Sequence, residues 1–484
     1  MSVHDVSFHV LPMQTRFPFQ YGIASMTALP HLFVTVRGEC GGVPLSGVSS
    51  EGLPPKWFTK DPETTFEDDL PQMLEVITVA ASNLTRAATG TFFDHWKELY
   101  YRQESWAREN GVPPLLANLG VSLMERALLD GFCRAMKVSL AEALRSNVLG
   151  LALGEVRDEL AGNDPADLLP AAPLSRIVAR HTVGLGDPLT TAQVEAPLED
   201  GLPFSLEECI AAYGIDHFKV KLCGVLEKDL ARLRTLQEIF QRDAAPDYKL
   251  TLDGNEQFPD IATLAAHWQA YRGDEAIRDL LTHVLFVEQP LHRDSALADE
   301  VKDGLSTWSD APPLIIDESE ADLTSLPRAL DLGYAGTSHK NCKGIVKGIA
   351  NACLLEHRRR RDPGRQFVLS GEDLANVGPV ALLQDLAVMA CLGIDHVERN
   401  GHHYFRGLSM YPDAVQAAVL AEHSDLYRRH EAGFPTLNIT AGSLEIGSVV
   451  TAPFGTKTQL ATSRLQTLDA WLADPTASPS RSKQ

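Results

Sequence analysis

Two lysines that alternate with apolar residues are the first candidates for chemistry in this chain. In residues 217–222 (HFKVKL), Lys219 and Lys221 alternate with Phe, Val and Leu. This period-two pattern predicts a strand with both lysines on one face. Like charges side by side, together with partial burial, would lower an ammonium pKa toward neutrality, where lysine acts as a general base. The alternative is an exposed edge strand whose charges deter aggregation.

Three carboxylates occupy equivalent places further along the chain. Asp253, Glu288 and Asp317 each end a largely apolar run, in LTLD, LFVE and LIID. Alone, each could be a strand-end cap or a salt-bridge partner. Brought together, three anions repel one another unless a cation joins them. Oxygen ligands with room left for water and substrate suit Mg²⁺, with Mn²⁺ as a possible substitute.

Eight short β-rich runs, alternating with helical segments, would position these side chains. They span residues 176–182, 217–222, 249–253, 284–288, 314–317, 336–340, 367–370 and 395–398. The closing residues Lys221, Asp253, Glu288, Asp317 and Lys340 are separated by 32, 35, 29 and 23 positions. A (β/α)8 barrel uses about 30 residues per unit and carries its active site at the C-terminal strand ends. The sequence therefore predicts an α/β fold, a modified (β/α)8 TIM-like barrel. No Gly-x-Gly-x-x-Gly follows the first strand, which disfavours a doubly wound open sheet.

The order of the strands makes a geometric prediction. The lysine pair is on the second strand and Lys340 is on the sixth, so they lie on opposite walls of a closed ring of eight. The three carboxylates fall on the strands between them. A substrate held there would meet an ammonium or amine on each face. This suits removal of a proton next to a carboxylate, with a metal stabilising the enolate charge that develops.

The remaining chain divides into further regions. Residues 1–141 read as the N-terminal part of an α+β capping domain, with a strand over 31–37 and helices over 64–84 and 115–140. We expect an insertion or linker at 142–174, the barrel at 175–405, a C-terminal segment packing on the cap at 406–474, and a disordered tail at 475–484. In the C-terminal segment, residues 437–440 and 443–450 read as strands joined by a glycine turn.

Composition excludes some partners. The net charge of −21 argues against binding of nucleic acid or an anionic membrane. No apolar run is long enough to span a bilayer, and the N-terminus has no secretory signal pattern. The seven cysteines are scattered without a C-x-x-C pair, which predicts reduced thiols in a cytoplasmic protein.

Taken together, the motifs resemble the enolase superfamily. The order K-x-K, D-x-N, E-Q-P, D-E-S and a sixth-strand lysine is similar to the muconate lactonizing enzyme subgroup of the mandelate racemase/muconate lactonizing enzyme family. The segments 17–22, 31–37, 47–51 and 125–130 (ERALLD) resemble that family's capping domain. The resemblance implies an Mg²⁺-dependent isomerase or lyase, a homo-oligomer, that abstracts the α-proton of a small carboxylate substrate through a metal-stabilised enolate. Racemisation or epimerisation, dehydration and cycloisomerisation all remain open.

The resemblance also implies roles for single residues. Asp253, Glu288 and Asp317 would bind the metal, Lys221 and Lys340 would form the acid/base pair, and Lys219 would tune Lys221 and touch the substrate carboxylate. Further candidates are Trp57 and Glu372 for substrate contact and Asn255 and Glu318 as supporting partners of the metal ligands. The cap loops 22–26 and 53–58 would set specificity.

Some features depart from the family pattern or leave alternatives open. The seventh strand lacks the histidine of mandelate racemases. Lys343 could compete with Lys340 for its role. His402 and His403 could line the pocket, although a solvent-facing loop is the expectation. The alternative function is a catalytically inactive barrel that binds a metal or ligand, but such a protein would have no evident use for lysines on both walls.

Overall fold

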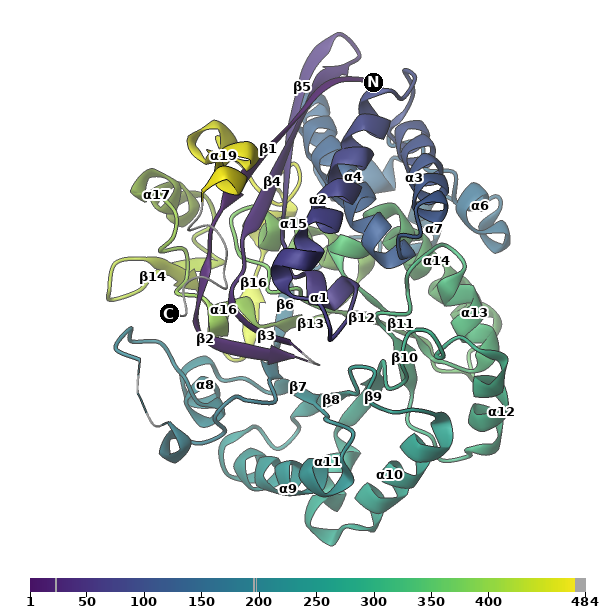
Figure 1. The fold of residues 1–484 in the computed structure, drawn as a ribbon, viewed down its shortest axis with the longest axis vertical. Helices are drawn as coiled ribbons and strands as arrows, with labels where there is room; N and C mark the ends of the chain where they lie inside the picture. The colour runs from purple at the N-terminus through teal and green to yellow at the C-terminus, as the bar shows by residue number, and fades with distance from the viewer. Residues whose placement is uncertain (22–23, 195, 197, 475–484) are drawn as a thin grey trace.

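Eight parallel strands form the centre of the molecule. The computed structural model describes residues 1–21, 24–194, 196 and 198–474. Each strand pairs with the next, and β13 pairs with β6, which closes the ring (Figure 1). The predicted α/β barrel is confirmed. The strands are β6 (Arg176–Val183), β7 (His217–Lys221), β8 (Lys249–Asp253), β9 (Val284–Glu288), β10 (Leu314–Ile316), β11 (Gly336–His339), β12 (Val368–Gly371) and β13 (His396–Arg399).

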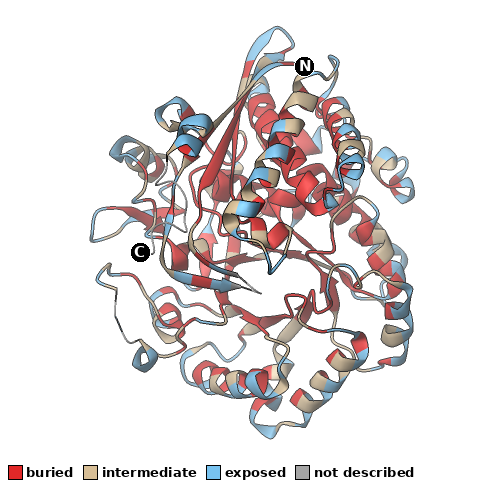
Figure 2. Cartoon of the chain, in the orientation of Figure 1, coloured by how far each residue is buried: buried red, intermediate tan, exposed pale blue. Residues whose placement is uncertain are grey.

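Helices surround the ring and bury the outer faces of the strands. Because the strands are covered on both faces, they are largely buried, whereas the outer helices carry exposed faces (Figure 2). The main barrel helices are α8 (Leu206–Tyr213), α9 (Leu226–Asp243), α10 (Ile261–Gly273), α11 (Arg278–Thr282), α12 (Asp299–Thr307), α13 (Ser325–Leu332), α14 (Ile345–Arg361), α15 (Ala381–Leu392) and α16 (Gly401–Tyr404). Shorter helices α5 (Leu140–Arg145), α6 (Leu153–Val156) and α7 (Pro165–Leu168) lead from the cap to the barrel.

An antiparallel sheet backed by helices forms the cap. Its strands are β1 (Ser2–Leu11), β4 (His31–Cys40) and β5 (Val43–Gly52), with a separate hairpin of β2 (Gln14–Tyr21) and β3 (Ala24–Ala28). Its helices are α1 (Pro55–Phe58), α2 (Phe66–Thr85), α3 (Phe92–Glu109) and α4 (Pro114–Met136). Two of them, α2 and α4, match the predicted helices. Reciprocal bonds between Thr65 and Asp68 and between Thr91 and Asp94 fix the first turns of α2 and α3.

Helix α4 attaches the cap to the barrel. Glu125 accepts hydrogen bonds from the first backbone N–H groups of α14, at Ile345 and at Val346 (3.5 Å). One residue on, Arg126 donates to the Ser50 carbonyl at 2.9 Å and to the Glu51 carboxylate at 2.9 Å. All of these side chains are buried. The 125–130 motif therefore joins the sheet of the cap to a barrel helix.

The C-terminal segment differs from its prediction. The expected strand at 443–450 divides into β16 (Ser443–Glu445) and helix α18 (Gly447–Val450). β16 pairs antiparallel with β6 of the barrel, and the nearby β15 (Pro435–Leu437) pairs with β14 (Tyr427–Arg429). The strand that reaches the cap is β17 (Gln466–Thr467), which pairs with the edge of β1. Local alternation did not distinguish these pairings, because it carries no information about the partner strand.

The C-terminal segment also contains two helices. α17 (Asp413–Glu422) and α19 (Leu468–Ala473) complete the described segment. None of the described helices is long and apolar enough to cross a membrane. The predicted disordered tail at 475–484 lies outside the described residues, and the division into five regions stays a prediction.

Candidate active site

The three predicted metal ligands lie side by side at the barrel mouth. Asp253 ends β8, where it is the register partner of Lys221 on β7 and of Glu288 on β9. Asp317 follows β10 directly. All three carboxylates are at most 1% exposed. Adjacent strand ends therefore bring three buried acidic groups together.

The donor set fits a hard divalent cation. Burial raises the pKa of Glu288 well above its ordinary value, and the charges of Asp253 and Glu372 raise it further. A bound cation would relieve this repulsion. Nearby, Asn255 Oδ1 and Glu318 Oε2 are buried without a hydrogen-bond partner among the residues that the structure describes. Carboxylate and amide oxygens of this kind match Mg²⁺.

Lysines on both sides of the acidic cluster contact its carboxylates. Lys221 Nζ lies 2.6 Å from Asp253 Oδ2, and Lys340 Nζ lies 2.6 Å from Asp317 Oδ2. Lys343 Nζ reaches Asp317 Oδ1 at 3.1 Å and the Ser338 carbonyl at 2.8 Å. Burial opposes ionisation of Asp317, but Lys340 and Lys343 hold its pKa well below the usual range. The ammonium groups thus compensate the charge of the acidic cluster.

The expectation of a lowered pKa is wrong for Lys219. Its side chain is fully buried, and Nζ lies 2.7 to 3.1 Å from carboxylates of four strands: Asp253, Glu288, Glu372 and Glu398. Burial alone would lower the pKa of Lys219, but these anions raise it well above the ordinary value. The four carboxylates outweigh the effect expected from the neighbouring Lys221. Asp253 and Glu288 contribute most, and the closed ring adds Glu372 and Glu398.

A cavity separates the barrel mouth from the cap. Lys221, Lys340, Asn255 and Trp57 line it, and the other lining residues are Phe19, Met26, Leu29, Pro54, Asp373, Leu374, Ala375, Glu398 and Asn400. Several predicted site residues are not among the lining residues. They are Lys219, Glu372, Glu318, Lys343 and the three predicted metal ligands Asp253, Glu288 and Asp317.

Both predicted cap loops contribute to this cavity. Pro54 and Trp57 come from the loop at 53–58, and Met26 comes from the loop at 22–26. Residues 22 and 23 of that loop lie outside the described residues. The Lys340 ammonium is 4.6 Å from the centroid of the Trp57 ring. A cap side chain therefore contacts one of the two predicted acid/base residues.

Sequence reasoning missed three polar lining residues, Asp373, Glu398 and Asn400. Glu398 accepts a hydrogen bond from Thr182 Oγ1 at 2.6 Å and is paired with Lys219 at 3.1 Å. It lies at the C-terminal end of the eighth strand, as the metal ligands lie at the C-terminal ends of the third to fifth. This position at a strand end could have identified Glu398 as a site residue from the sequence.

A charged clasp holds the Trp57 loop against the barrel. Glu256 follows β8 and is paired with Lys60 from the cap and with Arg293, which reaches it at 2.8 Å. Arg293 also donates to the carbonyls of Phe58 (2.7 Å) and Trp57 (3.1 Å). The clasp of Lys60, Glu256 and Arg293 therefore fixes the backbone that carries Trp57.

The expectation of solvent-facing histidines is also wrong. His402 and His403 are 6% and 2% exposed, and neither is among the cavity-lining residues. His402 Nε2 lies 3.2 Å from Nδ1 of His181 on β6, and His403 Nδ1 lies 3.6 Å from Sγ of Cys209 on α8. Both rings pack into the space between the barrel wall and its outer helices.

Comparison with known proteins finds similarity in structure rather than in sequence. No protein-family model matches the chain, and no curated protein matches it. A mandelate racemase/muconate lactonizing protein from Herpetosiphon aurantiacus is similar with a TM-score of 0.58 at 18% identity, covering 93% of this chain and 97% of its own. A dipeptide epimerase from Enterococcus faecalis V583, complexed with Mg and the dipeptide L-Leu-L-Tyr, gives 0.58 at 16% identity, covering 94% and 99%.

A third similar structure is a muconate lactonizing enzyme from Pseudomonas fluorescens complexed with muconolactone. Its TM-score is 0.55 at 15% identity, and the match covers 96% of this chain and 98% of that one. Identities this low establish the shape of the chain and leave its activity to the site. The chain thus has the fold of these mandelate racemase/muconate lactonizing proteins.

Proposed function

We propose that this protein is a Mg²⁺-dependent enzyme that abstracts the α-proton of a carboxylate substrate. The observation that carries the proposal is the presence of Lys221 and Lys340 in the lining of one cavity, each within 2.6 Å of a different acidic residue of the same cluster. A protein that only binds a ligand has no evident need for this arrangement. We also propose that the protein is of the muconate lactonizing enzyme subgroup.

Asp253, Glu288 and Asp317 would hold the metal. When bound, Mg²⁺ would supply positive charge next to the substrate carboxylate and so favour loss of the α-proton. Lys221 and Lys340 would face the α-carbon from opposite walls, and each would accept or return a proton at its Nζ. The Lys219 ammonium, held by four carboxylates, would keep the charge of the cluster compensated while Lys221 changes its protonation state.

The cap would exclude water and select the substrate. Phe19, Met26, Leu29 and Trp57 give the cavity an apolar wall, so we expect an apolar part of the substrate to lie against them. Glu398 and Asp373 line the same cavity and would favour a hydrogen-bond donor or cation elsewhere on the substrate. The similar structures were solved with a dipeptide and with a lactone. Both substrate classes, with acid sugars and N-acyl amino acids, belong in a screen.

Exchange of the α-proton with solvent tests the proposal. The wild-type protein with Mg²⁺ is incubated in D₂O with the library, and NMR follows the α-proton signal of each compound. We expect exchange in at least one class of carboxylate and its loss on chelation. If compounds bind by calorimetry and none exchanges, the protein is a binding barrel instead. The cytoplasmic location and the homo-oligomeric state stay predictions from the sequence.

A further inference from the structure

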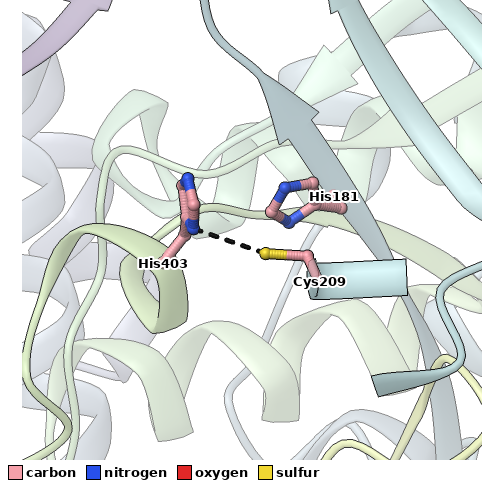
Figure 3. A group of neighbouring side chains, drawn as sticks. All are labelled: His181, Cys209 and His403. Atoms are coloured by element: carbon pink, nitrogen blue, oxygen red, sulfur yellow. Dashed lines mark hydrogen bonds between the residues drawn. The ribbon is translucent and has the colours of Figure 1, made fainter. Parts of the chain in front are cut away.

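A second group of potential metal ligands lies outside the barrel mouth. His181 on β6, Cys209 on α8 and His403 on α16 offer two imidazole nitrogens and a thiol, whose candidate ligand atoms all lie within 4.8 Å of one another (Figure 3). All three side chains are buried, at 2%, 0% and 2% exposure. The acid/base and Mg²⁺ chemistry proposed above uses none of them.

Strand alternation separates this group from the cavity. Thr182 Oγ1 donates to Glu398, so Thr182 faces the barrel interior. Its neighbour His181 must therefore face outward, toward the helices. Cys209 points toward the group from α8, and His403 points toward it from the short helix that follows β13 (Figure 3). The three side chains converge between the barrel wall and its outer layer.

The separation of Cys209 and His403 matches a zinc site. Zn–S and Zn–N bonds of about 2.3 and 2.0–2.1 Å at a tetrahedral angle put sulfur and nitrogen about 3.6 Å apart. Cys209 Sγ and His403 Nδ1 are 3.6 Å apart. A weak S–H···N hydrogen bond has a similar length, so the surroundings of the two histidines decide between the two interpretations.

Each histidine has a second nitrogen facing a polar partner. His403 Nε2 faces the Asp187 carboxylate at 4.0 Å, beyond hydrogen-bond length but in the place that the carboxylate takes in carboxylate–histidine–metal sites. Asp187 is itself held by the Tyr404 hydroxyl at 2.6 Å and the Gly184 N–H at 2.8 Å. His181 Nδ1 contacts Nε2 of His402 at 3.2 Å, which leaves Nε2 of His181 for a ligand. The outer contacts are those that orient imidazoles toward an ion.

We propose that His181, Cys209 and His403 bind a zinc ion that joins the two ends of the barrel. His181 is on the first barrel strand and is the register partner of Arg399 on the last. His403 follows four residues after Arg399, and Cys209 is on the helix that connects β6 to β7. The ion links the three segments at the place where β13 and β6 close the ring. A thiolate with two imidazoles selects zinc over Mg²⁺.

The position of the site also reaches the cap. The Arg16 guanidinium on β2 donates to the His403 carbonyl at 2.6 Å, and the Phe17 ring packs edge-on against the His403 ring at 4.9 Å. An ion that fixes His403 would therefore stabilise the contact of the β2–β3 hairpin with the barrel as well as the closure of the ring. A structural role fits this position, because His181 faces the outer helices, on the side of β6 opposite to the acid/base lysines.

Metal analysis with Zn²⁺ and Co²⁺ tests the site. Because the group is buried, the ion must enter during folding, so the protein is produced with added Zn²⁺ or Co²⁺ and dialysed against excess Mg²⁺ to occupy the barrel mouth. We expect one tightly held ion per chain. The Co²⁺ form should show a thiolate-to-cobalt charge-transfer band, and the Zn²⁺ form should melt several degrees higher than the apo form.

Variants locate the ion. Cys209→Ser should lose the charge-transfer band and the Zn²⁺-dependent rise in melting temperature, and Asp187→Asn should weaken Zn²⁺ binding about 10–100-fold. Cys353→Ser, a buried cysteine on α14, is the matched control and should change neither. Retention of less than one tightly held Zn²⁺ per wild-type chain overturns the proposal, and so does an unchanged cobalt spectrum in Cys209→Ser.

X-ray absorption at the zinc edge of the wild type gives a readout that does not depend on a variant folding. One sulfur and two imidazole ligands are expected. An oxygen-only shell would place the ion at the carboxylates and contradict the proposal.

Discussion

The ammonium of Lys340 lies 4.6 Å from the centre of the Trp57 ring, so the cap and the barrel meet at a predicted acid/base residue. Lys340 follows the sixth barrel strand, whereas Trp57 belongs to the short helix α1 of the cap. A cation held against an aromatic face contributes about 0.5–2 kcal/mol. The position of the cap loop is therefore coupled to the position of the Lys340 side chain.

Replacing Trp57 by Ala should change the substrate preference more than the stability. The variant loses the aromatic wall of the cavity and the contact with Lys340. Ratios of kcat/KM for a set of substrates, compared with the melting temperature, measure both effects. Trp57→Phe keeps an aromatic face and should lie closer to the wild type. A severe drop in melting temperature with an unchanged preference would make Trp57 a core residue only.

Breaking the clasp of Lys60, Glu256 and Arg293 should loosen the Trp57 loop. Glu256→Gln leaves Arg293 without its buried anion, and loss of one member of such a pair costs about 3 kcal/mol. Chemical denaturation measures the free energy of unfolding. Glu275→Gln removes an exposed partner of Arg278 at 3.5 Å and should cost less than about 1 kcal/mol. Equal effects of the two substitutions would exclude the clasp as a stabilising contact.

Glu256 of this clasp also makes the stability of the fold depend on pH. Burial opposes ionisation of Glu256, but Arg293 and Lys60 lower its pKa from 4.5 to about 2. Since the pKa is lower in the folded state, ionised Glu256 stabilises the fold above the unfolded value, and this contribution is lost as the pH falls toward 2. The stability difference between the wild type and Glu256→Gln should shrink over that interval. A difference that does not vary with pH would contradict the assignment.

Glu125 should give a pH dependence of stability opposite in sign to that of Glu256. Burial raises its pKa from 4.5 to about 7, although the Ile345 and Val346 N–H groups partly offset the shift. The folded state therefore keeps a proton that the unfolded state has lost, and stability falls as the pH rises from 4.5 through 7. Relative to Glu125→Gln, the wild type should become less stable across this range. Denaturation at several pH values tests it, and a rising wild-type stability would be inconsistent with a buried, protonated Glu125.

The metal assignment predicts large losses of affinity. Asp253→Asn, Glu288→Gln and Asp317→Asn should each weaken Mg²⁺ binding by at least about 10–100-fold. That is the loss typical of removing a residue that only supports a metal ligand, and these residues would be ligands themselves. Chelation should abolish activity, and Mg²⁺ should restore it. Asp260→Asn, at an exposed helix cap, is the control for removal of a charge. If calorimetry gives the wild-type Mg²⁺ affinity for all three variants, these residues are not the metal ligands.

The sequence predicted the barrel because its evidence is local and repeated. Asp253 and Glu288 each end an apolar run, and the unit length fixes which end of the barrel they reach. The environment of Lys219 could not be predicted, since Glu372 and Glu398 approach it only when the ring closes. The burial of His402 and His403 likewise depends on packing against β6 and α8, which two consecutive histidines in a loop do not indicate.

Proton exchange in single-lysine variants tests the central claim most directly. If the reaction is a racemisation or epimerisation, Lys221→Ala and Lys340→Ala should each stop turnover, with losses of about 10²–10⁴-fold. In D₂O, NMR should show that one variant still exchanges the α-proton of one stereoisomer, and the other variant that of the opposite isomer. For a syn elimination or cycloisomerisation, only one lysine should control exchange. Exchange and turnover that survive in Lys340→Ala but vanish in Lys343→Ala would contradict the account.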